Sequence, residues 1–256
     1  LVLALPVMSS GRAGLTAKVL NVGQGESVLF LSGAQAALVD CGSSNTWVNA
    51  GSVAANALNT MGKTELDYLI LTHYHSDHAN GLDTLFSRVR VKRLIVPQVH
   101  GASDQALEQE VLALAKQYGA EVTRLSDLRQ FQLGGAEMTL FPPLGAGSTN
   151  EEGLSLLCSC GDFDMLVTGD MDIDTEQRLL DSYTLPDIEV LVAGHHGSKT
   201  SSGDPLLSAA SPEIAVIPVG TNSYGHPTPE VLRRLVRAGV EVYRTDCNGT
   251  VSVVVS

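Results

Sequence analysis

The sequence is poor in charged and aromatic residues, and among its charged residues the basic ones are the scarcer. Only 17% of its 256 residues are charged and 5% are aromatic, whereas 44% are hydrophobic. That hydrophobic content suffices for one large domain with a substantial core. Aspartate and glutamate outnumber lysine and arginine by 28 to 16, so the formal net charge is −12. The shortage of basic residues argues against a generally basic nucleic-acid surface, because neutralising phosphates requires them.

Cysteine is also scarce, and its four positions show no C-x-x-C spacing: Cys41, Cys158, Cys160 and Cys247. The thiols of a Cys-x-Cys pair within a strand point to the same face, which is poor geometry for bridging them to each other. We therefore expect buried or idle thiols rather than a structural disulfide or a zinc site. The cysteine spacing does not indicate whether the protein works in a reducing or an oxidising compartment.

The sequence has no long hydrophobic run. Its apolar start, Leu1 to Met8, is far shorter than the roughly 20 residues that a membrane-spanning helix needs. It also lacks the basic leader of a signal peptide. The segment is either the trimmed end of a membrane span or a first strand. We expect residues 1–13 to form a membrane-proximal tail or linker, and residues 14–256 to form one domain.

What the sequence does contain is the run His73-Tyr74-His75-Ser76-Asp77-His78, with three imidazoles and a carboxylate in one short loop. The apolar stretch before it is typical of a buried strand, and α/β folds commonly build sites at the carboxyl ends of strands. His73 and His75 project the same way from an extended segment and can bind one metal ion. Asp77 and His78 follow where the chain turns, and we expect them to reach a second ion, as in two-metal hydrolases.

Strand-like and helix-like segments alternate along the rest of the chain. The pattern indicates strands at 16–22, 27–31, 36–40, 67–72, 93–97, 121–125, 138–141, 154–160, 164–168, 188–193, 214–218, 241–243 and 249–255. It indicates helices at 46–61, 79–88, 104–118, 175–183, 205–210 and 228–238. Strands first and last, with helices interspersed in each half, predict an α/β fold of two packed sheets covered by helices on both sides.

Two further motifs follow apolar strands. Asp170, in the run Val167-Thr168-Gly169-Asp170, emerges beside a turn, where its two oxygens can bridge two cations. His195 and His196 follow another such strand and are flanked by glycines, which let the backbone approach a ligand closely. Because adjacent side chains diverge, we assign His196 to the metal, and His195 to the substrate or to a contact behind the metal ligands.

Three more residues have weaker assignments. His226 precedes a helix and is either a donor to a phosphate or leaving group, or a solvent-facing residue of the helix-entry turn. Asp40 ends a strand, where it either accepts a hydrogen bond from a ligand histidine and fixes its tautomer, or merely terminates the strand. His100 lies in a loop after Pro97 and is interpreted as a surface residue.

Taken in order, HYHSDH, VTGD (167–170) and AGHHGS (193–198) resemble the motifs of the metallo-β-lactamase fold of binuclear metallohydrolases. The stretches LNVGQGES (20–27), GHHGSKTS (194–201) and NSYGHP (222–227) resemble those of ComEC-type competence proteins, and the likeness runs from about residue 15 to 255. The resemblance implies a four-layer αββα sandwich with two divalent metal ions, zinc or manganese, and no small organic cofactor.

ComEC-type proteins are membrane channels for the uptake of single-stranded DNA, and their lactamase-like domain is thought to degrade the strand that is not imported. The resemblance therefore implies a metal-dependent nuclease with DNA as its substrate, attached to the membrane channel portion of the same longer chain. It implies a location at the cell membrane, on the extracytoplasmic side. The residues present here are expected to be soluble by themselves.

The sequence departs from the family pattern at three places. Asn21 and Glu26 stand where the pattern has Asp. Many relatives also supply a third histidine to the first metal from a loop that corresponds here to residues 148–153, which contain no histidine. Either Glu151 or Asn150 replaces it, or the first site keeps two histidines, Asp170 and water. Fewer nitrogen ligands lower the preference for zinc and bring manganese into consideration.

The expected reaction is metal-assisted phosphodiester hydrolysis. One ion is bound by His73, His75 and Asp170; the other is bound by Asp77, His78, Asp170 and His196. Asp77 also orients the attacking water, and the groups expected to neutralise the phosphorus and assist the leaving oxygen are His195, His226 and Lys199. Two alternatives stay open. One is a stand-alone hydrolase of a small ester or lactam, favoured by the net charge; the other is a non-catalytic DNA-docking module of the uptake channel, favoured by the missing histidine.

Overall fold

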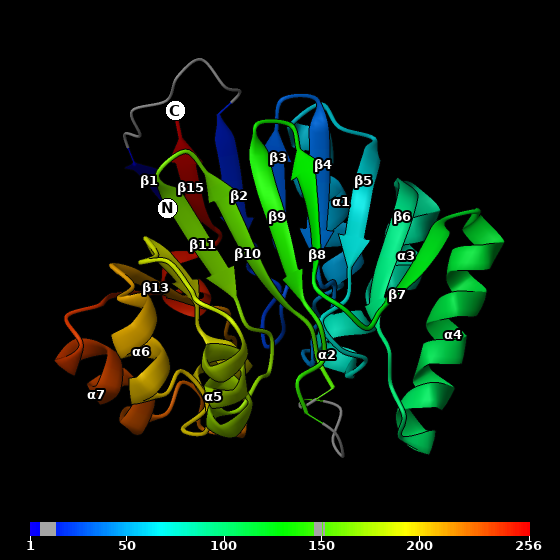
Figure 1. Ribbon diagram of the computed structural model, residues 1–256. Coiled ribbons are helices and arrows are strands. Elements are labelled where there is room, and N and C mark those ends of the chain that lie inside the picture. The colour runs from blue at the N-terminus through cyan, green and yellow to red at the C-terminus, as the bar shows by residue number, and fades with distance from the viewer. Residues whose placement is uncertain (6–13, 146–149, 151) are drawn as a thin grey trace.

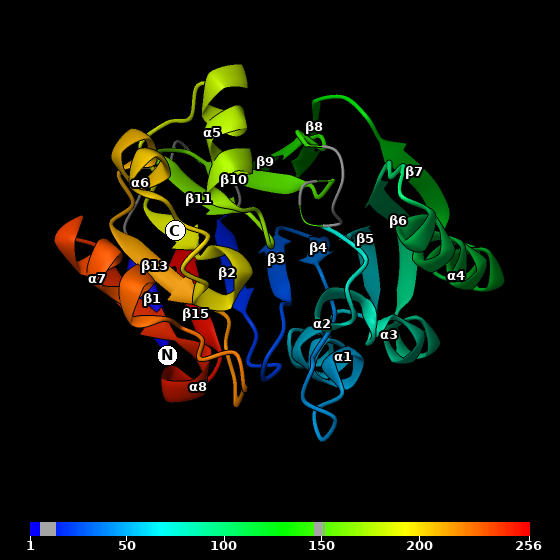
Figure 2. The ribbon, with the colours of Figure 1, turned by 90° about the horizontal axis from the view of Figure 1, so that it is seen from below.

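The computed structural model describes residues 1–5, 14–145, 150 and 152–256. Two sheets pack face to face, and helices cover the outer face of each sheet (Figure 1, Figure 2). The αββα sandwich predicted from the sequence is therefore confirmed.

The first sheet has eight strands and is mixed. β4 to β7 run parallel to one another, whereas β15, β2, β3 and β4 are antiparallel neighbours. The order across the sheet is β1 (Val2–Leu5), β15 (Val251–Val255), β2 (Leu15–Val19), β3 (Val28–Ser32), β4 (Gln35–Val39), β5 (Glu65–Ile70), β6 (Arg90–Pro97) and β7 (Glu121–Leu125).

The second sheet has seven strands, and β11 to β14 run parallel. Its order is β14 (Glu241–Arg244), β13 (Ile214–Ile217), β12 (Val190–Val192), β11 (Phe163–Val167), β10 (Ser155–Cys160), β9 (Ala136–Phe141) and β8 (Arg129–Leu133). In both sheets the parallel strands lead their carboxyl-terminal loops to the lower edge of the molecule in Figure 1. Figure 2 looks directly onto this edge.

Six helices complete the outer layers. The first sheet is covered by α1 (Ala50–Thr60), α3 (Leu82–Arg88) and α4 (Ala102–Tyr118), and the second by α5 (Ile173–Ser182), α6 (Asp204–Ala210) and α7 (Pro229–Arg237). Three short elements are α2 (Ser76–Ala79), the 3₁₀ turn η1 (Gly194–Gly197) and α8 (Thr245–Asn248). Helix α1 begins later than predicted, because Asn49 caps it by accepting a hydrogen bond from the Ser52 amide.

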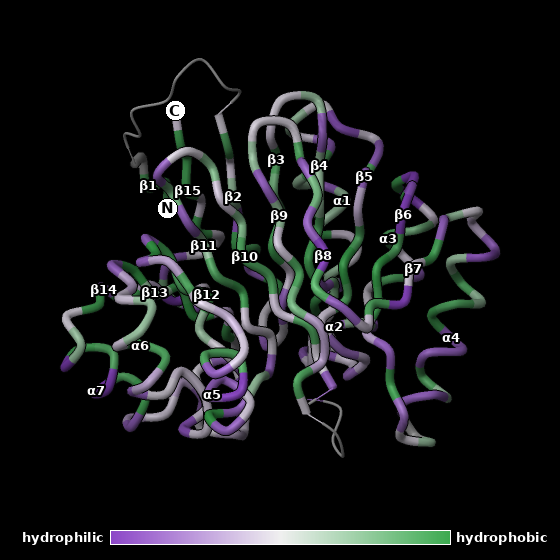
Figure 3. Tube along the Cα trace, in the orientation of Figure 1, coloured by the Kyte–Doolittle hydropathy of each residue, from purple (hydrophilic) through white to green (hydrophobic). Residues whose placement is uncertain are grey.

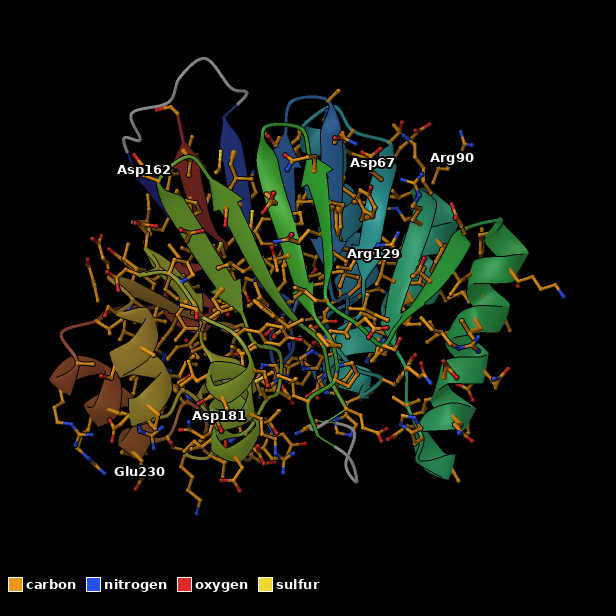
Figure 4. All side chains as sticks on the ribbon, viewed as in Figure 1. Asp67, Arg90, Arg129, Asp162, Asp181 and Glu230 are labelled. Atoms are coloured by element: carbon orange, nitrogen blue, oxygen red, sulfur yellow. The ribbon has the colours of Figure 1, made fainter. Side chains whose placement is uncertain are left out.

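Three hydrophobic clusters hold the layers together. The central one fills the space between the sheets and includes Phe30 and Val39 from one side and Met165 and Val192 from the other. The other two lie between each sheet and its helices. Hydrophobic residues accordingly follow the strands of both sheets in Figure 3, whereas the labelled charged side chains of Arg90, Asp162 and Glu230 lie on the outside in Figure 4.

The beginning of the chain belongs to the sheet. Residues 2–5 form β1, which pairs in parallel with β15, so the strand alternative holds for a part of the segment that we predicted to be a tail or linker. Residues 6–13 lie outside the described residues, and the domain boundary stays a prediction.

The short edge strand β8 was not predicted; its Arg-Gln-Phe-Gln-Leu run is mostly polar. Among the described helices, none combines the length and apolar character needed to cross a bilayer. The four cysteines are free, and all except Cys247 are buried.

Candidate metal centre

In the first half of the histidine loop, His73 and His75 project the same way, as the sequence predicted. His73 follows the end of β5, and its Nε2 lies 3.1 Å from Nδ1 of His75, so the two rings converge on one point. His73 is buried, whereas His75 is exposed. The second half turns into the short helix α2, which begins at Ser76 and carries Asp77 and His78 on its single turn.

Asp40 fixes the orientation of His78. The Nδ1 atom of His78 donates to Oδ2 of Asp40 at 2.7 Å, and both side chains are fully buried. Thr72 completes the support, since its amide and its hydroxyl donate to the two Asp40 oxygens at 2.7 and 2.6 Å. With Nδ1 committed in this way, His78 presents Nε2 to the centre, which is the arrangement that metal-binding histidines commonly show.

Asp170 lies between the histidines. Its Oδ1 is 3.1 Å from Nε2 of His78, and its Oδ2 is 3.8 Å from Nε2 of His73. The Nε2 atom of His196 lies 3.8 Å from Oδ1 of Asp170 and 3.5 Å from Oδ2 of Asp77. The structure therefore brings together the six residues that the sequence analysis assigned to two metal ions.

The backbone of turn η1 separates its two histidines. His195 and His196 both adopt left-handed conformations, with φ of 50° and 54°. The turn sends His196 into the interior, where its Nδ1 donates to the Pro218 carbonyl at 2.8 Å and leaves Nε2 facing Asp77. His195 stays partly exposed, and its Nε2 lies 3.5 Å from Oδ2 of Asp170. Backbone strain of this kind is common at functional sites.

Glycine allows the loops to pack closely behind the ligands. A Cβ atom added to Gly42 would lie 2.4 Å from the backbone of Asp77 and His78, and one added to Gly25 would lie 2.2 Å from the Gly42 carbonyl oxygen. The Glu26 amide also donates to the Asp77 carbonyl at 3.0 Å. The glycines of the VGQG and VDCG runs therefore let the turn with Asp77 and His78 rest directly on neighbouring backbone.

These donors fit divalent metal ions. His73, His78 and Asp170 form one compact group of potential ligands, and Asp77, His78 and His196 form another. Three buried atoms in the centre have no hydrogen-bond partner: Nε2 of His78, Oδ1 of Asp170 and Nε2 of His196. Buried polar atoms without partners are costly, so their convergence calls for a ligand that binds imidazole nitrogen and carboxylate oxygen together.

Electrostatics favour the protonation states that bind metal at two of these residues. Burial lowers the pKa of His73, and repulsion from His78 lowers it further, well below its usual value. Burial alone raises the pKa of Asp170, but the charges of His78 and His196 outweigh it and hold that pKa well below its usual range. Neutral imidazole and ionised carboxylate are the forms that ligate metal ions.

A pocket of about 380 Å³ opens onto this centre. It brings together residues from both halves of the chain and is lined by Gln24, Ser44, His75, Ser76, Asp77, Asn150, Asp170, His195, His196, Tyr224 and His226. His226 lies beside His195, with ring centroids 5.7 Å apart. Burial lowers the pKa of His226, and the charge of His195 lowers it further.

The structure does not bring Lys199 to this pocket. Lys199 is exposed and lines a separate hollow with Asp172, Asp174 and Arg234 among its other residues. The guanidinium of Arg234 donates to the carbonyls of Lys199, Ser201 and Ser202, and so holds the loop after η1 against α7. The fold of this loop therefore places Lys199 in a different hollow from the metal centre. The GHHGSKTS motif alone did not indicate this position.

In the segment that lacks the third histidine, only Asn150, Glu152 and Gly153 are among the described residues, and a Cβ atom added to Gly153 would lie 3.8 Å from Cβ of His73. The Leu154 amide donates to the Thr72 carbonyl, and Asn150 lines the pocket with an Oδ1 atom that has no hydrogen-bond partner. Glu151, the other replacement considered, lies outside the described residues. Buried Glu152 is engaged elsewhere, because it accepts from the His100 amide. The His100 side chain is exposed, in line with its interpretation as a surface residue.

The sequence analysis missed the buried carboxylate of Glu26. It lies with Asp40 and His78 in a third compact group, and neither of its oxygens has a hydrogen-bond partner. Burial raises its pKa to about 8. The position of Glu26 directly after Gly23-Gln24-Gly25 was the available signal, since glycine-rich turns mark close backbone approach. Tyr224 and Gln24, also missed as pocket residues, lie in motifs that were noted only for resemblance.

Comparisons with known proteins agree with this geometry. Residues 20–221 match the family model of the metallo-beta-lactamase superfamily. The chain is similar to ComE operon protein 3 of Bacillus subtilis (30% identity, 91% of this chain and 32% of that protein) and to competence protein ComA of Neisseria gonorrhoeae (32% identity, 90% and 31%). It thus spans about a third of the length of these curated relatives.

Solved structures show the same fold at low sequence identity. The metallo-beta-lactamase fold protein YhfI from Bacillus subtilis aligns with a TM-score of 0.66 and 14% identity, covering 95% of this chain and all of that one. CmlA, a diiron beta-hydroxylase from Streptomyces venezuelae, aligns with a TM-score of 0.60 and 16% identity, covering 95% of this chain and 54% of that one. With its sandwich, its cluster of histidines and aspartates, and its ComEC-type relatives, the chain belongs to the metallo-beta-lactamase superfamily.

Proposed function

We propose that this chain is a metal-dependent phosphodiester hydrolase that acts on DNA during natural transformation and degrades the strand that is not imported. The hydrolase part rests on one observation, the convergence of unpartnered ligand atoms from His78, Asp170 and His196 beside an open pocket. The similarity to competence proteins supports DNA as the substrate.

The donor set is divided between two divalent ions, zinc or manganese. His73, His75 and Asp170 hold one ion; Asp77, His78, Asp170 and His196 hold the other. When bound, such ions supply Lewis acidity and make water a nucleophile at neutral pH. Asp40 contributes by keeping His78 in the tautomer that presents Nε2.

The remaining side chains act on the substrate. The Asp77 carboxylate is 19% exposed at the pocket, where it orients the attacking water. His195 neutralises charge that develops on the phosphoryl oxygens. His226, whose pKa is lowered by burial, contributes an N–H donor to the substrate rather than a positive charge. The exposed Lys199 lies outside the pocket, so its proposed role is reduced to a contact with a longer strand.

The whole protein is proposed to extend beyond these residues, because the curated relatives are about three times as long. In this proposal the remainder of the natural chain forms the membrane channel that takes up DNA. The hydrolase domain then lies at the cell membrane on the extracytoplasmic side, where incoming DNA reaches the pocket.

The test is digestion of end-labelled single-stranded and double-stranded DNA by the purified chain with Mn²⁺, Zn²⁺ or EDTA. We expect cleavage with a divalent ion and none with EDTA, and no cleavage by Asp77→Ala under the same conditions. Asp83→Ala, which removes a nearby acidic residue of α3, is the matched control. Cleavage that persists in EDTA or in Asp77→Ala would refute the proposal.

A second candidate function is hydrolysis of a small ester or lactam. It is favoured by a neighbouring hollow of about 420 Å³ that shares His75 and Ser76 with the metal centre and is lined largely by apolar residues, among them Leu82, Leu107 and Val111. A chromogenic small ester, offered to the same samples, separates the two functions. Turnover of the ester without cleavage of DNA would favour this candidate, and DNA binding without either reaction would favour a docking module.

A further inference from the structure

An aromatic side chain is exposed at the mouth of the catalytic pocket. Tyr224 is 66% exposed and lines the same pocket as Asp77 and His196. A single exposed aromatic residue is ordinary on a protein surface. This one is distinguished by its place, because it lines the pocket that also contains Asp77, Asp170 and His196.

The backbone that carries the ring is held in position by its own loop. The Asn222 side chain accepts hydrogen bonds from the amides of Tyr224 and His226 at 3.1 and 3.0 Å, and donates to the carbonyl of His226 at 2.8 Å. The rings of Tyr224 and His226 have centroids 5.8 Å apart and are tilted by 33°. A ring that is positioned before binding loses little conformational freedom when it contacts a ligand.

This loop is also tied to the opposite half of the molecule. The side-chain amide of Asn45 donates to the Thr221 carbonyl at 2.7 Å, and the Gly220 amide donates to Oε1 of Gln24 at 3.2 Å. The VGQG run, which the sequence analysis noted only as part of a resemblance, thus anchors the loop that carries Tyr224. The backbone that carries Tyr224 is therefore positioned by contacts from both halves of the molecule.

Basic side chains of this pocket do not account for nucleic-acid binding. Among the described residues that line the pocket, none is lysine or arginine, and the chain has a formal net charge of −12. Proteins that bind single strands without sequence preference combine a positively charged groove with aromatic side chains on which bases stack, and the stacking tolerates any sequence because every base has a π face. Since the described pocket lining has no lysine or arginine, stacking is the part of this binding mode that the pocket can supply. A paired base is already stacked within its duplex and does not present that face.

We propose that Tyr224, supported by His226, is a stacking platform for an unpaired nucleobase next to the phosphate that is cleaved. This inference rests on the proposed nuclease function and deepens it, because it assigns the chain a preference for single-stranded segments. Tyr224 acts by binding the base and takes no part in bond breaking.

The test compares binding of two fluorescent single strands by the full chain carrying Asp77→Ala, with Mn²⁺ present. One strand carries bases throughout, and the other carries abasic sites at the central positions. We expect the base-bearing strand to bind roughly tenfold more tightly, within the range typical of one stacked base. Adding Tyr224→Ala is expected to abolish this preference, whereas adding Tyr224→Phe keeps it because the ring remains.

Two controls separate stacking from other effects. Val236→Ala removes a side chain of similar exposure on α7, away from the pocket, and is expected to keep the preference. The slope of log Kd against log salt concentration is expected to be the same with and without Tyr224, because stacking neutralises no phosphate. If Tyr224→Ala keeps the preference for the base-bearing strand, or Tyr224→Phe loses it, the stacking role of Tyr224 is refuted.

The outcome also distinguishes this inference from the function on which it rests. If the Asp77→Ala chain prefers the base-bearing strand but the wild-type chain cleaves no DNA with a divalent ion, or cleaves it equally in EDTA, the nuclease proposal fails and the stacking inference is supported. If the wild-type chain cleaves DNA only with a divalent ion but the Asp77→Ala chain binds both strands equally, the nuclease proposal is supported and the stacking inference fails.

Discussion

The Nε2 atom of His78 lies 3.1 Å from Oδ1 of Asp170, although the two residues follow strands of different sheets. His78 lies after β5 of the first sheet, and Asp170 lies after β11 of the second. His196, which follows β12, adds a further ligand from the second sheet. A metal ion bound among these residues therefore links the two halves of the sandwich.

The first prediction concerns stability. Removing divalent ions with EDTA is expected to lower the melting temperature, because ions that bind only the folded chain stabilise it by mass action. An ion at about 100 times its dissociation constant contributes about 2.7 kcal/mol, which corresponds to roughly 5–10 °C in a chain of this size. Thermal unfolding followed by circular dichroism, with EDTA and after adding Mn²⁺ or Zn²⁺, measures the shift. Equal melting temperatures would contradict the bridging role.

The second prediction concerns the unequal sites. In the proposed two-ion site, an ion at His73 and His75 would lack a third histidine and is expected to dissociate before its neighbour. Asn150→His, which adds an imidazole where an unpartnered Oδ1 now lines the pocket, is expected to raise its occupancy, and Asn150→Ala is the control. Elemental analysis after dialysis against chelator measures both. Two zinc ions held tightly by the unmodified chain would show that another residue completes the first site.

The third prediction separates two ligands by burial. Asp77→Ala and His78→Ala are both expected to lower the rate of hydrolysis by more than about 100-fold. This loss exceeds the range typical of substitutions at residues that only hydrogen-bond to a metal ligand. Asp77 is partly exposed, so its loss leaves the fold intact. His78→Ala leaves the buried Asp40 carboxylate without one of its donors and is expected to cost about 1–3 kcal/mol of stability. Initial rates and denaturant unfolding of the same samples check both parts, and unchanged turnover in either variant would show that the second ion is not used.

The fourth prediction concerns Glu176, which lies outside the metal ligands. Burial raises its pKa from 4.5 to about 7, against the effect of hydrogen bonds from the Gly203 and Ser202 amides. Between these two values the folded chain binds a proton that the unfolded chain has lost, so stability falls as pH rises through this window. The full change is about 3 kcal/mol, since each pH unit corresponds to about 1.4 kcal/mol.

Glu176→Gln removes this titration and is the matched variant. It is expected to be less stable than the wild type near pH 5, because its amide nitrogen cannot accept from the backbone N–H, whereas both oxygens of the protonated carboxyl group can. The difference between the two proteins is expected to shrink as pH rises from 5 to 8. Urea unfolding at several pH values measures it, and a difference that does not change with pH would show that Glu176 keeps its ordinary pKa.

The sequence by itself determined most of the strands and longer helices, and the site residues that follow them. Apolar runs such as Leu69-Ile70-Leu71 are buried on both faces of a sheet that lies between two layers. Burial on both faces can be predicted from one such continuous run. The site motifs follow these runs directly, and the carboxyl ends of parallel strands meet at one edge. The convergence of His73, Asp170 and His196 could therefore be predicted without knowing the order of the strands.

Only the tertiary structure decided which atoms face one another. Glu26 is buried against His78 because loops of the same sheet meet at one edge, and Asn45 supports the loop of Tyr224 because the two sheets bring their loops into contact. Lys199 lies outside the pocket, and Arg234 holds its loop against α7 by donating to the Lys199 carbonyl. Periodicity encodes burial within one element, whereas such contacts depend on how separate elements pack.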